Sequence, residues 1–233
     1  MTKTRRFSLA LLATALCATL APAAPHAVAQ AAPTRLSADA VAARVQAFYD
    51  RTETIEARFS QTFYHRMYDR YQRSAGQLVV DKPGRMRFDY DQPNGKVFVS
   101  DGSHLTAYEP GEDGAPGQYL KQSVGGNATV GGLAFLTGHT RIADDYRTRL
   151  LNAATYRWRG HVLELVPRVS DPQVRRILLY VDARPGTAGV IHRIRIDDHD
   201  GNRNKLELRS LRFNRDVPNA RFAFRPPSNA IRL

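Results

Sequence analysis

The sequence predicts a mainly β protein built on one large antiparallel sheet, with a helix before it and a helical segment inserted midway. Three observations carry this prediction. Apolar and polar residues alternate with a period of two along many short stretches. Clusters of glycine, proline, asparagine and aspartate separate these stretches at short intervals, which favours antiparallel neighbours. Residues 37–49 instead follow the helical period of 3.6.

The first helix is predicted to begin after Ser37. Its hydroxyl can accept a hydrogen bond from the free backbone N–H groups of the first turn, and Leu36 is placed to pack on Val41. The apolar residues share one side of this helix: Val41, Val45, Phe48 and Tyr49. We therefore expect that side to pack against the rest of the protein.

The strand pattern recurs about eleven times. It is clearest in the third stretch, where Met86, Phe88 and Tyr90 alternate with charged residues. The expected strands cover residues 55–63, 78–80, 86–90, 97–99, 105–108, 119–122, 155–158, 162–166, 174–181, 191–196 and 206–213. A sheet of that many antiparallel strands must curl, because strands twist.

A helical segment is predicted at residues 127–146, with a break near 137–138. Its apolar side chains would be Leu133, Phe135, Leu136 and Ile142. An insertion of this kind, midway along the chain, is well placed to cover the concave side of a curled sheet.

The first 29 residues have the three parts of a secretory signal peptide. Basic residues come first, an apolar run follows, and Ala27-Val28-Ala29 supplies a cleavage site. The only cysteine, Cys17, falls inside this segment, so we expect a cysteine-free mature protein in an oxidising compartment such as the periplasm. No linker divides residues 30–233, which we interpret as a single domain.

The chain is strongly basic, with 34 lysine and arginine residues against 22 acidic ones and a net charge of +12 over 233 residues. Such an excess is typical of proteins that bind nucleic acid or anionic membranes. Here the arginines mostly alternate with apolar residues along strands, as Arg193 and Arg195 do. That pattern indicates the hydrated face of a half-buried sheet and, together with export, argues against a nucleic-acid partner.

Catalytic and metal-binding motifs are not evident in the sequence. The seven histidines form no ligand pair of the His-Glu-x-x-His type, and the glycine-rich stretch 124–132 lacks the lysine of a phosphate loop. Residues 197–200 are acidic but lead into Gly201 and Asn202, so we predict a hairpin turn there. We therefore predict no enzyme, no metal and no cofactor, although a hydrolase with a dispersed site stays open as an alternative.

Several motifs, in order along the mature chain, resemble the periplasmic outer-membrane lipoprotein carriers of the LolA type. The first is Ala57-x-Phe59-x-Gln61 after one helix. The central block, the lid-helix segment and the closing motif of that family resemble residues 76–110, 133–138 and 222–227. Each motif alone is weakly specific, but the ordered set covers essentially the whole mature chain.

The resemblance implies an unclosed antiparallel β-barrel of about eleven strands, with helices covering a hydrophobic cavity. It also implies a role. Family members take triacylated lipoproteins from an inner-membrane ABC complex, carry them across the periplasm and deliver them to an acceptor lipoprotein in the outer membrane. No cofactor takes part, and we expect a monomer. A periplasmic binder of other lipids or hydrophobic small molecules on the same scaffold is the alternative.

The expected site residues follow from the alternation together with this resemblance. We expect the cavity to be lined by Phe59, Phe63, Met86, Phe88, Tyr90, Val97 and Val99. The lid would carry Leu133, Phe135, Leu136 and Ile142. The resemblance further implies that Lys82 holds the lid and that Met86 lies at the mouth, where the family commonly has arginine and an aromatic residue.

Overall fold

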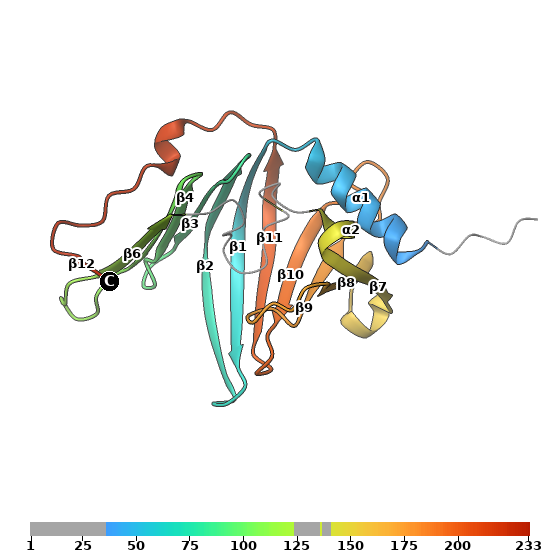
Figure 1. Ribbon diagram of the computed structural model, residues 1–233, viewed down its shortest axis with the longest axis horizontal. Helices are drawn as coiled ribbons and strands as arrows, with labels where there is room; N and C mark the ends of the chain where they lie inside the picture. The colour runs from blue at the N-terminus through green and yellow to red at the C-terminus, as the bar shows by residue number, and fades with distance from the viewer. Residues whose placement is uncertain (1–35, 124–135, 137–140) are drawn as a thin grey trace, which may run out of the picture. The chain divides into compact units, whose positions relative to one another are not determined.

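The computed structural model describes residues 36–123, 136 and 141–233, which form twelve strands in one sheet, two α-helices and two short 3₁₀ helices (Figure 1). The helices are α1 (Ala38–Asp50), α2 (Ile142–Asp145), η2 (Ala153–Tyr156) and η3 (Asn219–Phe222). The strands are β1 (Thr54–His65), β2 (Arg70–Asp81), β3 (Arg85–Tyr90), β4 (Val97–Asp101), β5 (His104–Glu109), β6 (Gln118–Ser123), β7 (Tyr146–Leu151), β8 (His161–Pro167), β9 (Arg176–Val181), β10 (Ile191–Asp197), β11 (Arg203–Phe213) and β12 (Ile231–Arg232).

The sheet is unclosed, as predicted. Its strand order is β12-β6-β5-β4-β3-β2-β1-β11-β10-β9-β8-β7, so β12 and β7 lie at opposite edges. Consecutive strands pair antiparallel within β1–β6 and within β7–β11, and β1 joins the two halves by pairing with both β2 and β11. The one parallel pair in this sheet joins β12 to β6. None of the helices in the described part of the chain is long and apolar enough to cross a membrane.

Helix α1 begins as its sequence predicts. The Ser37 hydroxyl accepts a hydrogen bond from the Ala40 backbone N–H at 3.1 Å. The predicted apolar side faces the protein, because Val41, Val45 and Tyr49 are each at most 2 % exposed. Figure 1 shows α1 and α2 together at the end of the sheet that carries β7 and β8, and α1 contacts both of these strands.

One main core lies between the helices and a single face of the sheet. We call this the inner face; it contributes Phe59, Leu78, Phe88, Leu163 and Ile194, among others, to one cluster with the buried side of α1. The opposite, outer face carries two smaller clusters, one around Val79, Val99 and Phe222 and one around Val162, Leu178 and Tyr180. A sheet with one dry and one partly hydrated face explains the period-two sequence pattern.

The prediction of a strand at 155–158 is wrong. The first two of these residues are the end of η2, which starts where the Asn152 side chain accepts a hydrogen bond from the Ala154 N–H at 3.1 Å. Arg157, directly after η2, has a left-handed backbone (φ 50°). The strand in this part of the chain is β7, which precedes η2. It begins at Tyr146, the last residue of the helix that the sequence predicts at 127–146. In the described part of that expected helix, α2 covers only Ile142–Asp145; residues 127–135 and 137–140 lie outside the described residues.

The C-terminal segment crosses the outer face of the first half of the sheet (Figure 1). Phe222 packs on Val79 and Val99, and the Arg85 guanidinium lies 5.1 Å from the Phe222 ring centroid. The Arg87 guanidinium donates hydrogen bonds to the carbonyls of Arg221 and Ala223. Arginines on this face thus bind the chain's own C-terminal segment.

Candidate functional site: the inner face

Strand register builds a continuous apolar row on the inner face. Residues directly opposite one another in antiparallel strands project to the same side of the sheet. Starting from Phe88 in the main core, the register places Leu78 and Ala57 on one side of it and Phe98, Ala107 and Leu120 on the other. The row runs from the buried centre to Leu120, whose side chain is 41 % exposed.

Four aromatic rings form the centre of this surface, and we call them the inner aromatic cluster: Phe59, Phe88, Tyr90 and Phe98. The Phe59 ring meets Phe88 and Tyr90 edge to face, with centroids 5.4 and 5.0 Å apart, and Tyr90 meets Phe98 at 5.8 Å. Phe59 and Phe88 are buried, whereas Tyr90 and Phe98 are only half-buried. The cluster therefore reaches from the core to the accessible part of the inner face.

Gly76 makes this cluster possible. It lies on β2 between its partners Phe59 on β1 and Tyr90 on β3. A Cβ atom at this position would be 2.6 Å from the Cζ atom of Phe59. Only glycine leaves the space in which the Phe59 ring can cross β2 to reach the aromatic residues of β3.

The cluster ends at a polar border. The Tyr90 hydroxyl donates a hydrogen bond to Gln61 Oε1 at 2.8 Å, and Gln61 Nε2 donates to Asn204 Oδ1 at 2.9 Å. Burial raises the pKa of Tyr90 to about 12, so the hydroxyl stays protonated and remains a donor. Phe63 lies one step beyond Gln61 on the inner face and is half-buried, with its ring edge-on to His65.

Val97 and Val99 were expected to line the cavity, but the structure places them on the outer face. They pair with Asp89 and Arg87, whereas Phe98 between them pairs with Phe88. Both valines pack in the cluster around Phe222. The inner-face residue of β4 is therefore Phe98, which the sequence reasoning missed because three consecutive apolar residues give no alternation to read.

Lys82 and Met86, expected at the lid and the mouth, have different surroundings. The Lys82 ammonium donates a hydrogen bond to the carbonyl of Tyr49, at the C-terminal end of α1. Burial lowers the pKa of Lys82, while the nearby Asp50 carboxylate acts in the opposite direction. Met86 is 3 % exposed and belongs to the main core. Lys82 thus holds the first helix, and Met86 contributes packing.

Two of the expected lid residues are described, and both are buried in the main core. Leu136 and Ile142 are each 1 % exposed and belong to the same cluster as Phe59 and the buried side of α1. The Ile142 backbone N–H donates a hydrogen bond to Gln46 Oε1 of α1 at 2.9 Å. Leu133 and Phe135 lie outside the described residues.

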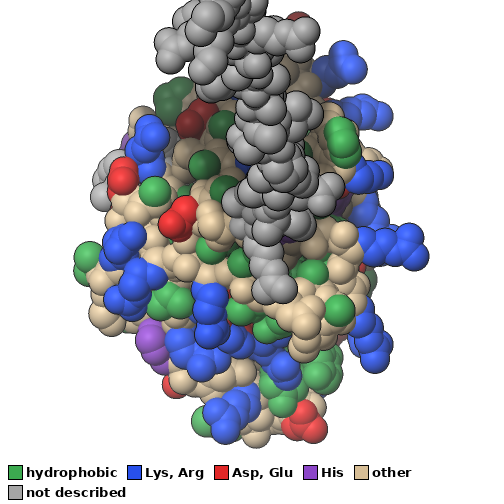
Figure 2. Space-filling view, turned by 90° about the vertical axis from the view of Figure 1, so that its right-hand side faces the viewer, with side chains coloured by type: hydrophobic (Ala, Val, Ile, Leu, Met, Phe, Trp, Pro, Cys, Tyr) green, Lys and Arg blue, Asp and Glu red, His purple; other side chains and the backbone are tan. Residues whose placement is uncertain are grey.

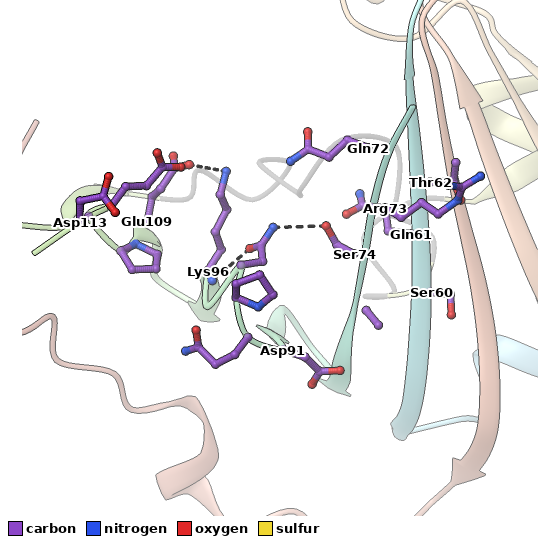
Figure 3. A pocket seen from close by; sticks show the side chains of 17 residues that line it. Ser60, Gln61, Thr62, Gln72, Arg73, Ser74, Asp91, Lys96, Glu109 and Asp113 are labelled. Atoms are coloured by element: carbon purple, nitrogen blue, oxygen red, sulfur yellow. Dashed lines mark hydrogen bonds and ion pairs between the residues drawn. The ribbon is translucent and has the colours of Figure 1, made fainter. Parts of the chain in front are cut away.

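A polar hollow of about 980 Å³ adjoins the inner face (Figure 3). Gln61, which borders the aromatic cluster, also lines this hollow, together with Gln72, Arg73 and Ser74 of β2. In Figure 3, Lys96 and Glu109 lie across from the β2 side chains, and these two form an ion pair. The hollow is therefore bounded by β2 on one side and by the turn at 92–96 and the loop at 109–113 on the other.

Some of the charged groups on the described residues pair with one another, and others stand on the surface without an acidic neighbour. Figure 2 shows lysine and arginine side chains flanking hydrophobic ones on the face drawn, with few acidic side chains between them.

The predicted turn at 197–200 is confirmed, because the Asp198 carboxylate accepts a hydrogen bond from the Asn202 N–H at 2.8 Å. Asp197 is buried and bound by Arg176 and Arg195 at 2.8 and 2.6 Å. Within the described ranges, no three His, Cys, Asp or Glu residues group as metal ligands would.

These features define a class of protein: an unclosed antiparallel β-sheet with one apolar, aromatic face partly covered by helices. Within that class, the chain belongs to the family described as outer membrane lipoprotein carrier protein LolA, whose model matches residues 50–225. The outer-membrane lipoprotein carrier protein of Chromobacterium violaceum is 28% identical over 205 residues, which cover 88% of this chain and 91% of that protein. The carrier protein of Serratia proteamaculans is also 28% identical, over 196 residues, 84% of this chain and 88% of its own.

Among solved structures, a LolA superfamily protein from Nitrosomonas europaea aligns with a TM-score of 0.46 at 13% identity, over 81% of this chain and 98% of its own.

Proposed function

We propose that this chain is a non-enzymatic periplasmic carrier of lipoproteins. It binds the acyl chains of triacylated lipoproteins that an inner-membrane ABC complex releases and delivers them to an acceptor lipoprotein in the outer membrane. A signal peptide at residues 1–29 exports it, and residues 30–233 act as a single domain, as a monomer and without a cofactor. Membership of the lipoprotein carrier family supports this proposal.

The energetic reason for such a carrier lies in the acyl chains. Each methylene group transferred from an apolar environment to water costs about 0.8 kcal/mol, so a long acyl chain costs on the order of 10 kcal/mol. Three chains on one cargo cannot cross an aqueous space unaided. A protein surface that replaces water around them removes most of that cost.

The observation that carries the proposal is the inner aromatic cluster and the apolar row that contains it. Tyr90 and Phe98 are half-buried and Leu120 is more exposed, all on the face that α1 partly covers. These rings are held by strands on both sides, so the surface is preformed. We propose that acyl chains pack on this surface, with Phe63 extending it, and that residues Leu133, Phe135, Leu136 and Ile142 cover it.

The experiment is release of a triacylated lipoprotein from inner-membrane vesicles that contain the cognate ABC complex. Phe98 and Val97 are neighbours on β4. Both are half-buried, and their side chains project to opposite faces of the sheet. We expect Phe98→Ser to lower the amount of released lipoprotein several-fold and Val97→Ser, the matched control, to leave it near the wild-type level. Equal loss in both variants would contradict the assignment of the inner face as the lipid site.

Two further outcomes are informative. A wild-type protein that binds lipid but releases no lipoprotein would contradict the carrier role and favour a binder of other lipids.

A second variant tests the residues proposed to cover the lipid surface. Phe135→Asp is expected to reduce release, because a carboxylate is costly to bury against acyl chains. Wild-type activity in that variant would contradict the role of residues 133–142.

A further inference from the structure

Strand β2 is longer than its neighbour β3, and this leaves part of it with one partner. The register pairs β1 with β2 from Arg70 to Asp81, over the whole strand. Strand β3 pairs only with residues 76–81. Among the residues that the structure describes, no strand pairs with residues 70–74 on the side away from β1.

The backbone groups that face this open side can be identified. The Asp91 N–H donates a hydrogen bond to the Ala75 carbonyl at 2.9 Å, so the backbone of Ala75 faces away from β1. In an antiparallel strand the N–H and C=O of one residue point to the same side and alternate along the chain. The backbone groups of Arg73 and Tyr71 therefore also face the open side. Residues 70–74 extend over about 17 Å at 3.4 Å per residue.

The open edge faces the polar hollow rather than a flat surface. Gln72, Arg73 and Ser74 line the hollow from the β2 side, and Asn94 reaches across to donate a hydrogen bond to the Ser74 hydroxyl at 3.2 Å. Its volume of about 980 Å³ is within the range of ligand sites in proteins. Most of the side chains that line it are polar, which suits a polypeptide backbone better than an acyl chain.

We infer that the edge of β2 at residues 70–74 binds an extended segment of the cargo polypeptide, immediately after its acylated residue, by adding a strand to the sheet. The inference rests on the proposed carrier function. Gln61 lines the hollow and accepts the hydrogen bond of Tyr90, so the hollow begins where the inner aromatic cluster ends. Acyl chains that pack on the cluster would therefore bring the attached peptide into the hollow.

Strand addition would let one carrier bind cargo of varied sequence. Backbone hydrogen bonds supply the affinity, and they are the same for every sequence except at proline. The hollow favours a single extended chain over a second copy of this protein. Its far wall, the turn at 92–96 and the loop at 109–113, stands where the sheet of a partner molecule would have to continue.

The test uses two probes and two variants of the mature protein. The probes are a triacylated cysteine ester and the same triacylated cysteine followed by a hexapeptide. Arg73→Pro removes the outward N–H without removing a bond to β1, and Arg73→Ala is the matched control because it loses the side chain but keeps the donor. We expect the wild type to bind the peptide-bearing probe about tenfold more tightly than the ester. Arg73→Ala should still prefer the peptide-bearing probe, whereas Arg73→Pro should bind both probes equally.

Amide hydrogen exchange provides a second measurement in the wild type, which keeps the inference testable if Arg73→Pro unfolds. The N–H groups of Tyr71 and Arg73 should exchange more slowly with the peptide-bearing probe than with the ester. Equal affinity for the two probes with unchanged exchange would overturn the peptide site and leave the carrier function standing. Failure of the wild type to bind either probe would overturn both. Protection at Tyr71 and Arg73 that rises only with protein concentration would identify a second copy as the occupant.

Discussion

Gly76→Ala should be the most damaging single methyl addition in the first half of the sheet. The new Cβ would lie 2.6 and 2.8 Å from two carbons of the Phe59 ring, and closer still to the carbonyl oxygen of Asp89. Because such separations are not tolerated, either the ring or β3 must move. Overpacking of a core costs about 1–3 kcal/mol, and each edge-to-face contact that Phe59 loses, with Phe88 or Tyr90, costs about 0.5–1.5 kcal/mol. We expect the free energy of unfolding to fall by about 3 kcal/mol.

Urea denaturation followed by the fluorescence of Trp158, the single tryptophan, measures this change. With a slope of about 2–3 kcal/mol per molar urea, the midpoint should fall by about 1 M. Gly186→Ala is the control, because nothing lies within 4 Å of the added methyl and only its positive φ of 85° is strained; it should cost about 1 kcal/mol. A Gly76→Ala midpoint equal to that of the wild type would refute the role assigned to this glycine.

Three further substitutions test the supports around the inner face. Ser37→Ala should lower the free energy of unfolding by about 1 kcal/mol, measured by urea denaturation, because the cap of α1 is lost; an unchanged midpoint would contradict the cap. Lys82→Met should cost about 1–2 kcal/mol and lower the Tm by a few degrees, whereas Lys82→Arg should retain most of the stability, because a cation at the Tyr49 carbonyl is then kept. Hydrogen bonds from Arg184 hold the pKa of Asp182 well below its usual range. The Asp182 carboxylate therefore adds to the free energy of unfolding above the unfolded pKa of about 4, and this addition is lost as the pH falls toward the folded pKa. Unfolding free energies between pH 2 and 5 should therefore fall less steeply in Asp182→Asn than in the wild type, and parallel curves would contradict this reading.

Local sequence patterns predicted most of the sheet correctly. Alternation over a few residues decides whether a stretch is a strand, and Met86, Phe88 and Tyr90 could be placed on one face because charged residues separate them. The cap at Ser37 was predictable for the same reason, since a cap involves residues only three positions apart. Where the alternation ended, the sequence no longer predicted which side chains face inward. At Val97 and Phe98 the sequence offered no period, and only pairing with β3 decided which side chain faces inward.

The candidate site was therefore predictable in part. Phe59, Phe88 and Tyr90 could be named from the pattern, but their meeting depends on Gly76, which lets one ring cross a strand. The open edge of β2 had no signal at all. It exists because β3 ends at Tyr90 while β2 and β1 continue past it, and strand length beyond a partner is a property of pairing, not of composition.

The sequence by itself determined the class of fold, the helix start and the apolar alternation on which the carrier proposal depends, because each is set by neighbours within a few residues. The tertiary structure decided three things: which face Val97 and Val99 occupy, that the Lys82 ammonium binds the end of α1, and that the C-terminal segment around Phe222 covers the outer face. These contacts join residues far apart in the chain. Their geometry depends on strand register and twist accumulated across the sheet, which no local pattern records.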